Sequence, residues 1–128
     1  MVRPFLAADE KPLYWVGSAK RDLLAFPQPV IEELGVALSV AQFGGKHPEA
    51  KPWKGTGSGV FEVVEDHFGD TFRAVYTVRF ARAAYVLHAF QKKSPAGRRT
   101  ARMDVETITR RLNAAKLDYE VRYGTTRQ

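Results

Sequence analysis

The sequence of 128 residues contains no cysteine. This absence excludes a disulfide framework, a thiolate zinc site, an iron–sulfur cluster and a cysteine nucleophile. The sequence also has no apolar run of the roughly 18–20 residues that a membrane-spanning helix requires. Its N-terminus lacks the charged-then-apolar pattern of a signal peptide. We therefore expect a cytoplasmic protein without a membrane partner.

Acidic residues are missing from one contiguous quarter of the chain. Neither Asp nor Glu occurs between Thr71 and Met103, where the basic residues are Arg73, Arg79, Arg82, Lys92, Lys93, Arg98, Arg99 and Arg102. The whole chain has 20 basic and 14 acidic residues, a net charge of +6, so the excess positive charge lies within this segment. Such asymmetry indicates an anionic partner, although a solvated strand and loop produce the same pattern.

The composition is that of an ordinary globular protein. The chain is 45% apolar and 27% charged, close to the averages for soluble domains. Its length suits one domain, and it shows no internal repeat or low-complexity segment. We expect a single domain over residues 1–128, with its core at about residues 11–115.

The first half of the chain predicts a short strand and a helical hairpin. Residues 11–17 (KPLYWVG) are aromatic and β-branched and end in glycine, which is typical of a strand. Ser18 is expected to cap a helix that Pro27 ends. A second helix is expected to begin at Pro29 and to end at the Gly44–Gly45 pair. Its apolar stripe recurs at spacings of three and four: Val30, Ile31, Leu34, Leu38 and Ala41.

The second half predicts an antiparallel meander after an irregular loop over residues 47–59. Three runs have strand character and short connections: Val60–His67, Thr71–Phe80 and Ala83–Lys92. Alternation in the middle run assigns Phe72, Ala74, Tyr76, Val78 and Phe80 to a core face. The same alternation assigns Arg73, Val75, Thr77 and Arg79 to a solvated, basic face.

A basic loop over Lys92–Arg102 is expected to precede a last helix that begins near Asp104. The apolar stripe of this helix is Val105, Ile108, Leu112 and Ala115. The predicted fold class is therefore α+β: a small, mostly antiparallel sheet in the order strand, two-helix hairpin, three-strand meander, C-terminal helix. The helices are expected to gather against one face of that sheet.

Metal and cofactor sites are not predicted. The three histidines, His47, His67 and His88, lack any metal-ligand spacing. The glycine-rich stretch over residues 55–59 lacks the strand-before, helix-after setting and the Lys-Ser/Thr of a phosphate-binding loop. We expect no metal and no small-molecule cofactor.

A basic and aromatic group in the second half is the best candidate for a site. Arg73 lies on the polar side of the central strand, and Lys92 and Lys93 end the neighbouring strand. His88 and Phe90 share a strand face with Lys92 by the period of two. Cations neutralise phosphates and rings stack on bases, so this pattern suits a phosphodiester partner. Cleavage of RNA would further require a group that moves the 2′-hydroxyl proton.

Several motifs resemble one toxin family. They are LYWVGSAKRDLLAFP (residues 13–27), LSVAQFG (38–44), AKPWKGTGSGVFEV (50–63), TFRAVYTVRF (71–80), YVLHAFQKKS (85–94) and DVETITRRLNAA (104–115). In this order they resemble the toxins of type II toxin–antitoxin pairs, in the RelE/ParE superfamily and its phage-derived, HigB-like branch. The resemblance spans residues 11–115, and the small RelE-like sheet with two N-terminal helices agrees with the predicted order.

The resemblance implies a ribosome-dependent endoribonuclease, an mRNA interferase that cuts mRNA on the ribosome and inhibits translation. It also implies a cognate antitoxin, expected to be a helix-turn-helix protein. Arg73 matches the arginine that contacts the scissile phosphate, and Lys92 and Lys93 match the basic end of the last strand. Glu62 and His88 are the acid/base candidates. Further RNA contacts are expected from Arg79, Phe90, Arg98, Arg99 and Arg102.

The sequence also departs from the cleaving members. The strand before Arg73 carries Glu62, Val63 and Val64 where well-studied cleavers carry lysines. Only Tyr119 and Tyr123 are candidates for the C-terminal tyrosine that some members use. Two alternatives therefore stay open: a non-enzymatic, ParE-like toxin that inhibits DNA gyrase, and an inactive phage-derived relative.

Overall fold

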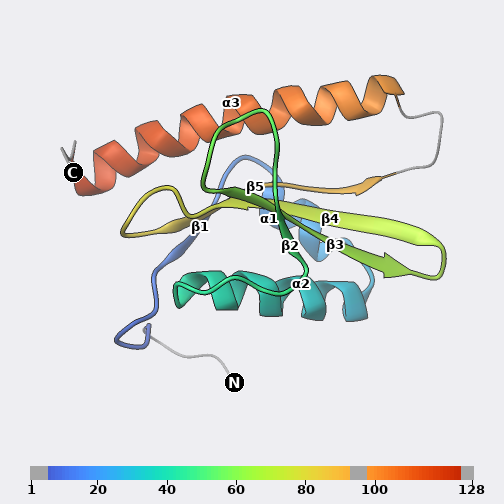
Figure 1. Ribbon diagram of the computed structural model, residues 1–128, viewed down its shortest axis with the longest axis horizontal. Coiled ribbons are helices and arrows are strands. Elements are labelled where there is room, and N and C mark those ends of the chain that lie inside the picture. Colours follow the sequence, from blue (N-terminus) through green and yellow to red (C-terminus); the bar gives the residue numbers. More distant parts are fainter. Residues whose placement is uncertain (1–5, 93–97, 125–128) are drawn as a thin grey trace.

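The fold is a five-stranded sheet between two layers of helices (Figure 1). The computed structural model describes residues 6–92 and 98–124. The elements in chain order are β1 (Leu13–Trp15), α1 (Ala19–Leu24), α2 (Gln28–Gln42), β2 (Ala50–Pro52), β3 (Val60–His67), β4 (Asp70–Thr77), β5 (Ala84–Lys92) and α3 (Arg98–Tyr123). The predicted α+β class is confirmed.

The strand order is β1-β5-β4-β3-β2. The strands from β2 to β5 pair antiparallel, and β1 alone pairs parallel, with β5. The strand β2 lies inside residues 47–59, so the prediction of an irregular loop there is wrong in part. A strand of three residues shows no periodicity, and Pro52 is tolerated because β2 lies at the edge of the sheet.

The central strand β4 is shorter than predicted. The β3–β4 turn consists of Phe68 and Gly69, with φ of 49° and 85°, so β4 begins at Asp70. The strand ends at Thr77, whose buried hydroxyl donates to the Gly59 carbonyl (2.8 Å) and accepts the Arg79 backbone N–H (3.1 Å). The Val78 backbone N–H donates to the same Gly59 carbonyl (2.9 Å), and regular strand pairing ends there. The connection to β5 is therefore longer than the two residues predicted.

Helices α1 and α2 cover one face of the sheet. Their buried side chains pack with Phe72, Ala74 and Tyr76 of β4, as the alternation predicted. The predicted α2 stripe is confirmed for Val30, Leu34, Leu38 and Ala41, which are at most 3% exposed, and the fifth member, Ile31, packs partly buried against the same core. Ser18 occupies the N-cap position of α1, but its hydroxyl donates to the Asp22 carboxylate (2.6 Å) and not to the backbone, as a cap would require.

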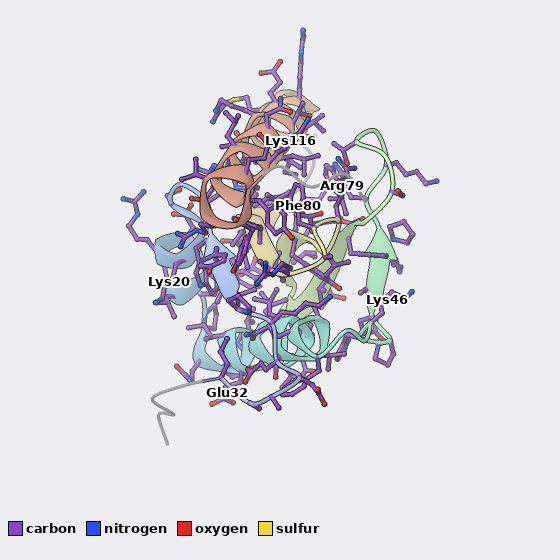
Figure 2. All side chains as sticks on the ribbon, turned by 90° about the vertical axis from the view of Figure 1, so that its left-hand side faces the viewer. Lys20, Glu32, Lys46, Arg79, Phe80 and Lys116 are labelled. Atoms are coloured by element: carbon purple, nitrogen blue, oxygen red, sulfur yellow. The ribbon has the colours of Figure 1, made fainter. Side chains whose placement is uncertain are left out.

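Helix α3 covers the opposite face, so the prediction that all helices share one face is wrong. Figure 2 views the three layers after a quarter turn, with Lys116 of α3 and Glu32 of α2 on opposite sides. Val75 and Ile108 are fully buried in this second core. Phe80 also packs there, although it was assigned to the first face. The β4 face expected to be wet and basic is therefore largely covered.

Helix α3 is longer than predicted at both ends. It begins at Arg98, six residues before Asp104, and it continues to Tyr123. Its predicted stripe is confirmed for Ile108, Leu112 and Ala115, whereas Val105 is 45% exposed. No helix in the described ranges is long and apolar enough to cross a membrane.

A polar contact ties the C-terminal half of α3 to the sheet. The Tyr85 hydroxyl donates to Asp118 Oδ2 (2.7 Å), and Arg122 Nε donates to the same oxygen (2.6 Å). Burial alone would raise the pKa of Asp118, but these two donors together outweigh burial and lower it.

We predict that Ile108→Ala lowers the free energy of unfolding by about 2–5 kcal/mol, because it leaves a cavity between α3 and the sheet. Val121→Ala on the same helix is the control, because Val121 is 87% exposed, and it should change stability by less than about 0.5 kcal/mol. Urea denaturation measures both. Equal effects would show that α3 does not pack as described.

A second prediction concerns pH. The lowered pKa of Asp118 stabilises the fold above the unfolded pKa of an aspartate, and this contribution is lost as pH falls through the lower folded pKa. Asp118→Asn should therefore cost about 0.5–1 kcal/mol at pH 7. The difference from wild type should disappear in acid, below the folded pKa. Glu120→Gln serves as the control, and a pH-independent difference would contradict this account.

Candidate functional site

Four of the predicted site residues lie together on the sheet face beneath the N-terminal half of α3. The register pairs Arg73 with Phe90, and Val75 with both Glu62 and His88. Residues two apart along a strand share a face, so Glu62, Arg73, His88 and Phe90 come from three adjacent strands onto one surface. Lys92 extends the same surface at the exposed end of β5.

Arg73 and Glu62 form an ion pair in this cluster. Arg73 Nη1 lies 2.5 Å from Glu62 Oε1, and the side chains are only 20% and 18% exposed. Arg73 Nε is buried without a hydrogen-bond partner in the described part of the chain. Arg73 is thus a half-buried, internally paired residue and not the solvated cation expected. A phosphate would have to share its guanidinium with Glu62.

His88 is held by two residues of α3. Its Nε2 lies 2.9 Å from Asp104 Oδ1 and its Nδ1 lies 3.5 Å from Arg111 Nη1, while the ring stacks on Phe90 with centroids 4.6 Å apart. An aspartate beside an imidazole fixes the orientation of the ring. Both ring nitrogens nevertheless face protein groups, so His88 can exchange a proton with substrate only if one of these contacts opens.

Sequence reasoning missed Asp104 and Arg111. The sequence predicts Asp104 only as the start of the last helix, and it predicts no role for Arg111. Their spacing of seven residues, with the apolar Ile108 between them, places all three on one helix face. This pattern was the available signal for two polar groups that face the sheet.

Arg111 also joins α3 to the other helical layer. Its guanidinium donates to the Leu87 carbonyl (3.0 Å) and to Ser18 Oγ (3.1 Å). It passes so close to Gly17 that a Cβ there would lie 2.9 Å from it, and the φ of Gly17 is +57°. Glycine is therefore favoured at position 17, because any other residue would be strained there.

Arg79 has a different structural environment from Arg73. It lies beyond the end of β4, beside the loop that follows β2 (Figure 2), and its side chain donates to the backbone carbonyls of Thr56 and Ser58. The backbone of Gly59 approaches it closely, with a Cβ position 3.1 Å from Arg79 Cα. Arg79 thus fixes this loop, and its contact with RNA stays a prediction.

The remaining predicted cations are distributed along α3 or lie outside the described residues. Arg98 and Arg99 belong to the first turn of α3 and not to a loop, and their side chains lie outside the description. Arg102 is 82% exposed and pairs with Glu106 in solvent (3.6 Å). Lys93 lies outside the described residues, as do residues 94–97 of the predicted basic loop.

The two C-terminal tyrosines lie far from Arg73. The Tyr119 hydroxyl accepts the Arg82 backbone N–H (3.1 Å), and the Tyr123 hydroxyl bonds to that of Tyr14 (2.9 Å). Tyr119 follows Asp104, the partner of His88, by fifteen residues on α3, which is about 22 Å along a helix. Neither tyrosine reaches the cluster around Arg73.

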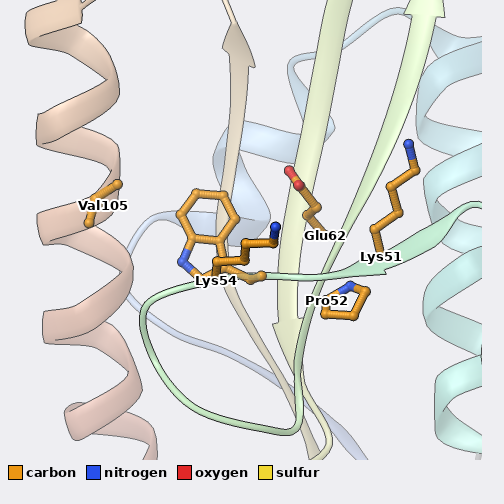
Figure 3. A pocket seen from close by; sticks show the side chains of 6 residues that line it. Lys51, Pro52, Lys54, Glu62 and Val105 are labelled. Atoms are coloured by element: carbon orange, nitrogen blue, oxygen red, sulfur yellow. The ribbon is translucent and has the colours of Figure 1, made fainter.

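A hollow of about 560 Å³ opens beside this cluster, between β2 and α3 (Figure 3). Its lining residues are Lys51, Pro52, Trp53, Lys54, Glu62 and Val105. Of these, only Glu62 was predicted as a site residue. The sequence KPWK over residues 51–54, two cations around an aromatic ring, was the signal that could have identified the others. In the described ranges no group of His, Asp and Glu side chains is arranged to hold a metal ion.

The chain matches a known protein family. The family model described as "Phage derived protein Gp49-like (DUF891)" matches residues 21–113. No curated protein and no solved structure matches the chain.

We predict that Arg73→Ala lowers the free energy of unfolding by about 1–3 kcal/mol, because it leaves the half-buried Glu62 unpaired. Arg102→Ala removes a solvent-exposed partner of Glu106 and should cost less than about 0.5 kcal/mol. The double variant Glu62→Gln, Arg73→Ala should be less destabilised than the sum of the single variants. Strict additivity in denaturation experiments would show that the ion pair contributes nothing.

Proposed function

This chain belongs to the phage-derived Gp49-like family, and from that membership we propose that it is the toxin of a type II toxin–antitoxin pair. The RelE-like motifs of the sequence support this role, and they imply a cognate antitoxin as partner. The HigB-like branch and a helix-turn-helix antitoxin stay predictions. Because fold alone does not define activity, the choice of target rests on the site.

We propose further that the toxin is an endoribonuclease that cuts mRNA on the ribosome. The observation that carries this proposal is the convergence of Arg73, Glu62, His88, Phe90 and Lys92 on one sheet face. The cations suit a phosphodiester, and the two stacked rings offer an apolar surface beside them. The carboxylate and the imidazole are groups that can move protons.

Glu62 is the better acid/base candidate of the two. It lines an open hollow, whereas both ring nitrogens of His88 face α3. In this proposal Glu62 accepts the proton of the 2′-hydroxyl, whose oxygen then attacks the adjacent phosphorus. The 5′-oxygen leaves and takes a proton from water, and the products are a 2′,3′-cyclic phosphate and a 5′-hydroxyl. Arg73 and Lys92 stabilise the charge that develops on the phosphate oxygens.

The ion pairs within the site also support a second function, in which the toxin does not cleave RNA. Arg73 and His88 both have acidic partners within the chain, Glu62 and Asp104. If these pairs serve only to hold the fold, the protein would act without cleaving RNA. It would then inhibit a target such as DNA gyrase by surface complementarity, or it would be inactive.

Induction of the chain in bacteria, followed by primer extension on a translated message, separates these functions. Nuclease action predicts growth arrest and cuts that appear only during translation. Arg73→Lys keeps the positive charge but loses the planar guanidinium, and Glu62→Gln loses the base. Each variant should reduce cleavage by roughly 10²–10³-fold.

Lys116→Ala is the matched control, because it removes one exposed cation from the outer surface of α3 (Figure 2). It should cut like the wild type. Growth arrest with DNA damage and intact messages would instead support the gyrase function. Full cleavage by Glu62→Gln would remove Glu62 from the mechanism.

A further inference from the structure

We propose that the hollow between β2 and α3 binds one nucleotide of single-stranded RNA and prefers a base with an exocyclic amino group. The proposal rests on RNA as the substrate of the proposed function. The hollow measures about 560 Å³, within the range of small-molecule sites. It shares Glu62 with the cluster around Arg73, so a nucleotide bound there would adjoin the cleaved phosphodiester.

The walls of the hollow suit a planar base. Trp53, in the loop that follows β2, and Val105 both line it, and Val105 lies on the α3 side (Figure 3). Val105 is 45% exposed although it belongs to the apolar stripe of α3. Trp53 packs partly against the second core, and its indole Nε1 is buried without a partner in the described residues. A base stacked on this ring would cover its apolar surface.

Two free cations border the hollow. Lys51 and Lys54 are both exposed, and neither forms an ion pair with the described residues. The nearby arginines of the acid-free segment differ from these lysines, because Arg73 pairs with Glu62 and Arg79 bonds to loop carbonyls. The lysines are therefore available for the phosphates on either side of the base.

Glu62 provides base selectivity. Its Oε1 accepts a hydrogen bond from Arg73, and its Oε2 has no partner in the described part of the chain. An ionised carboxylate only accepts hydrogen bonds. It therefore favours the amino groups of cytosine, adenine or guanine and disfavours the carbonyl oxygens of uracil.

The loop that carries these groups is held in place before any ligand binds. Arg79 bonds to the Thr56 and Ser58 carbonyls, and the Trp53 backbone N–H donates to the Val60 carbonyl (2.8 Å). Pre-organisation of this kind lowers the entropic cost of binding.

The test uses the full-length chain and single-stranded hexanucleotides of cytidine or uridine at low salt. The protein has two tryptophans, and Trp15 packs in the first core on the other side of the sheet. Binding in the hollow should therefore quench the fluorescence of Trp53 alone. We expect the cytidine oligomer to bind about tenfold more tightly than the uridine oligomer.

Variants separate the groups of the site. Lys51→Ala and Lys54→Ala should each weaken binding about threefold or more and reduce the slope of log affinity against log salt by about 0.7. Lys20→Ala, which removes an exposed lysine from α1 (Figure 2), should change neither. Trp53→Phe should retain binding without the quench, Trp53→Leu should weaken binding, and Glu62→Gln should bring the cytidine preference close to unity.

The outcomes distinguish this proposal from the proposed nuclease. If RNA quenches Trp53 fluorescence and cytidine oligomers bind more tightly than uridine oligomers, but the protein cuts no message, the subsite is supported and the nuclease is rejected. Cleavage by a protein whose Trp53 fluorescence is not quenched by RNA would overturn the subsite while the nuclease stands. Equal losses of RNA affinity in Lys51→Ala and Lys20→Ala would have the same consequence. Absence of RNA binding at any concentration would also overturn it.

Discussion

The contact of α3 with the sheet determines where the charged residues of this protein can lie. Ile108, Leu112 and Ala115 cover Val60, Val75 and Leu87, so the face that carries Arg73 is apolar over much of its area. A charge on such a surface must be paired or must reach the edge. Arg73 pairs with Glu62, and Asp104 contacts His88. The unpaired lysines of β2 and its loop lie at the border of the hollow.

The same contact divides the surface beneath α3 into two parts. Toward the C-terminal end of α3, Tyr85, Asp118 and Tyr119 form buried or half-buried hydrogen bonds that fasten the helix. Toward its N-terminal end, the hollow opens between α3 and β2, beside Glu62. The site thus lies where packing is incomplete, next to packing that keeps its side chains in place.

The positive charge of the chain is less concentrated in space than in sequence. Arg79 holds a loop, Arg82 lies over the Tyr123 ring, and Arg102 pairs with Glu106. Lys51 and Lys54 come from outside the acid-free segment and join Lys92 on the Arg73 side of the sheet. An RNA partner would therefore meet a surface assembled from β2 and its loop, β4 and β5, and not one basic stretch.

Local periodicity determined the elements and the face on which a residue lies. The α2 stripe, the bounds of β3 and the placement of Arg73, His88 and Phe90 follow from spacings of three and four or of two, which the backbone geometry of each element imposes. Tertiary structure alone decided that α3 covers the second face, that three residues form β2, and that Glu62 and Asp104 pair with Arg73 and His88. These contacts join residues eleven to sixteen positions apart or on separate elements. Their energy depends on burial and on the position of the partner, and no local spacing encodes either.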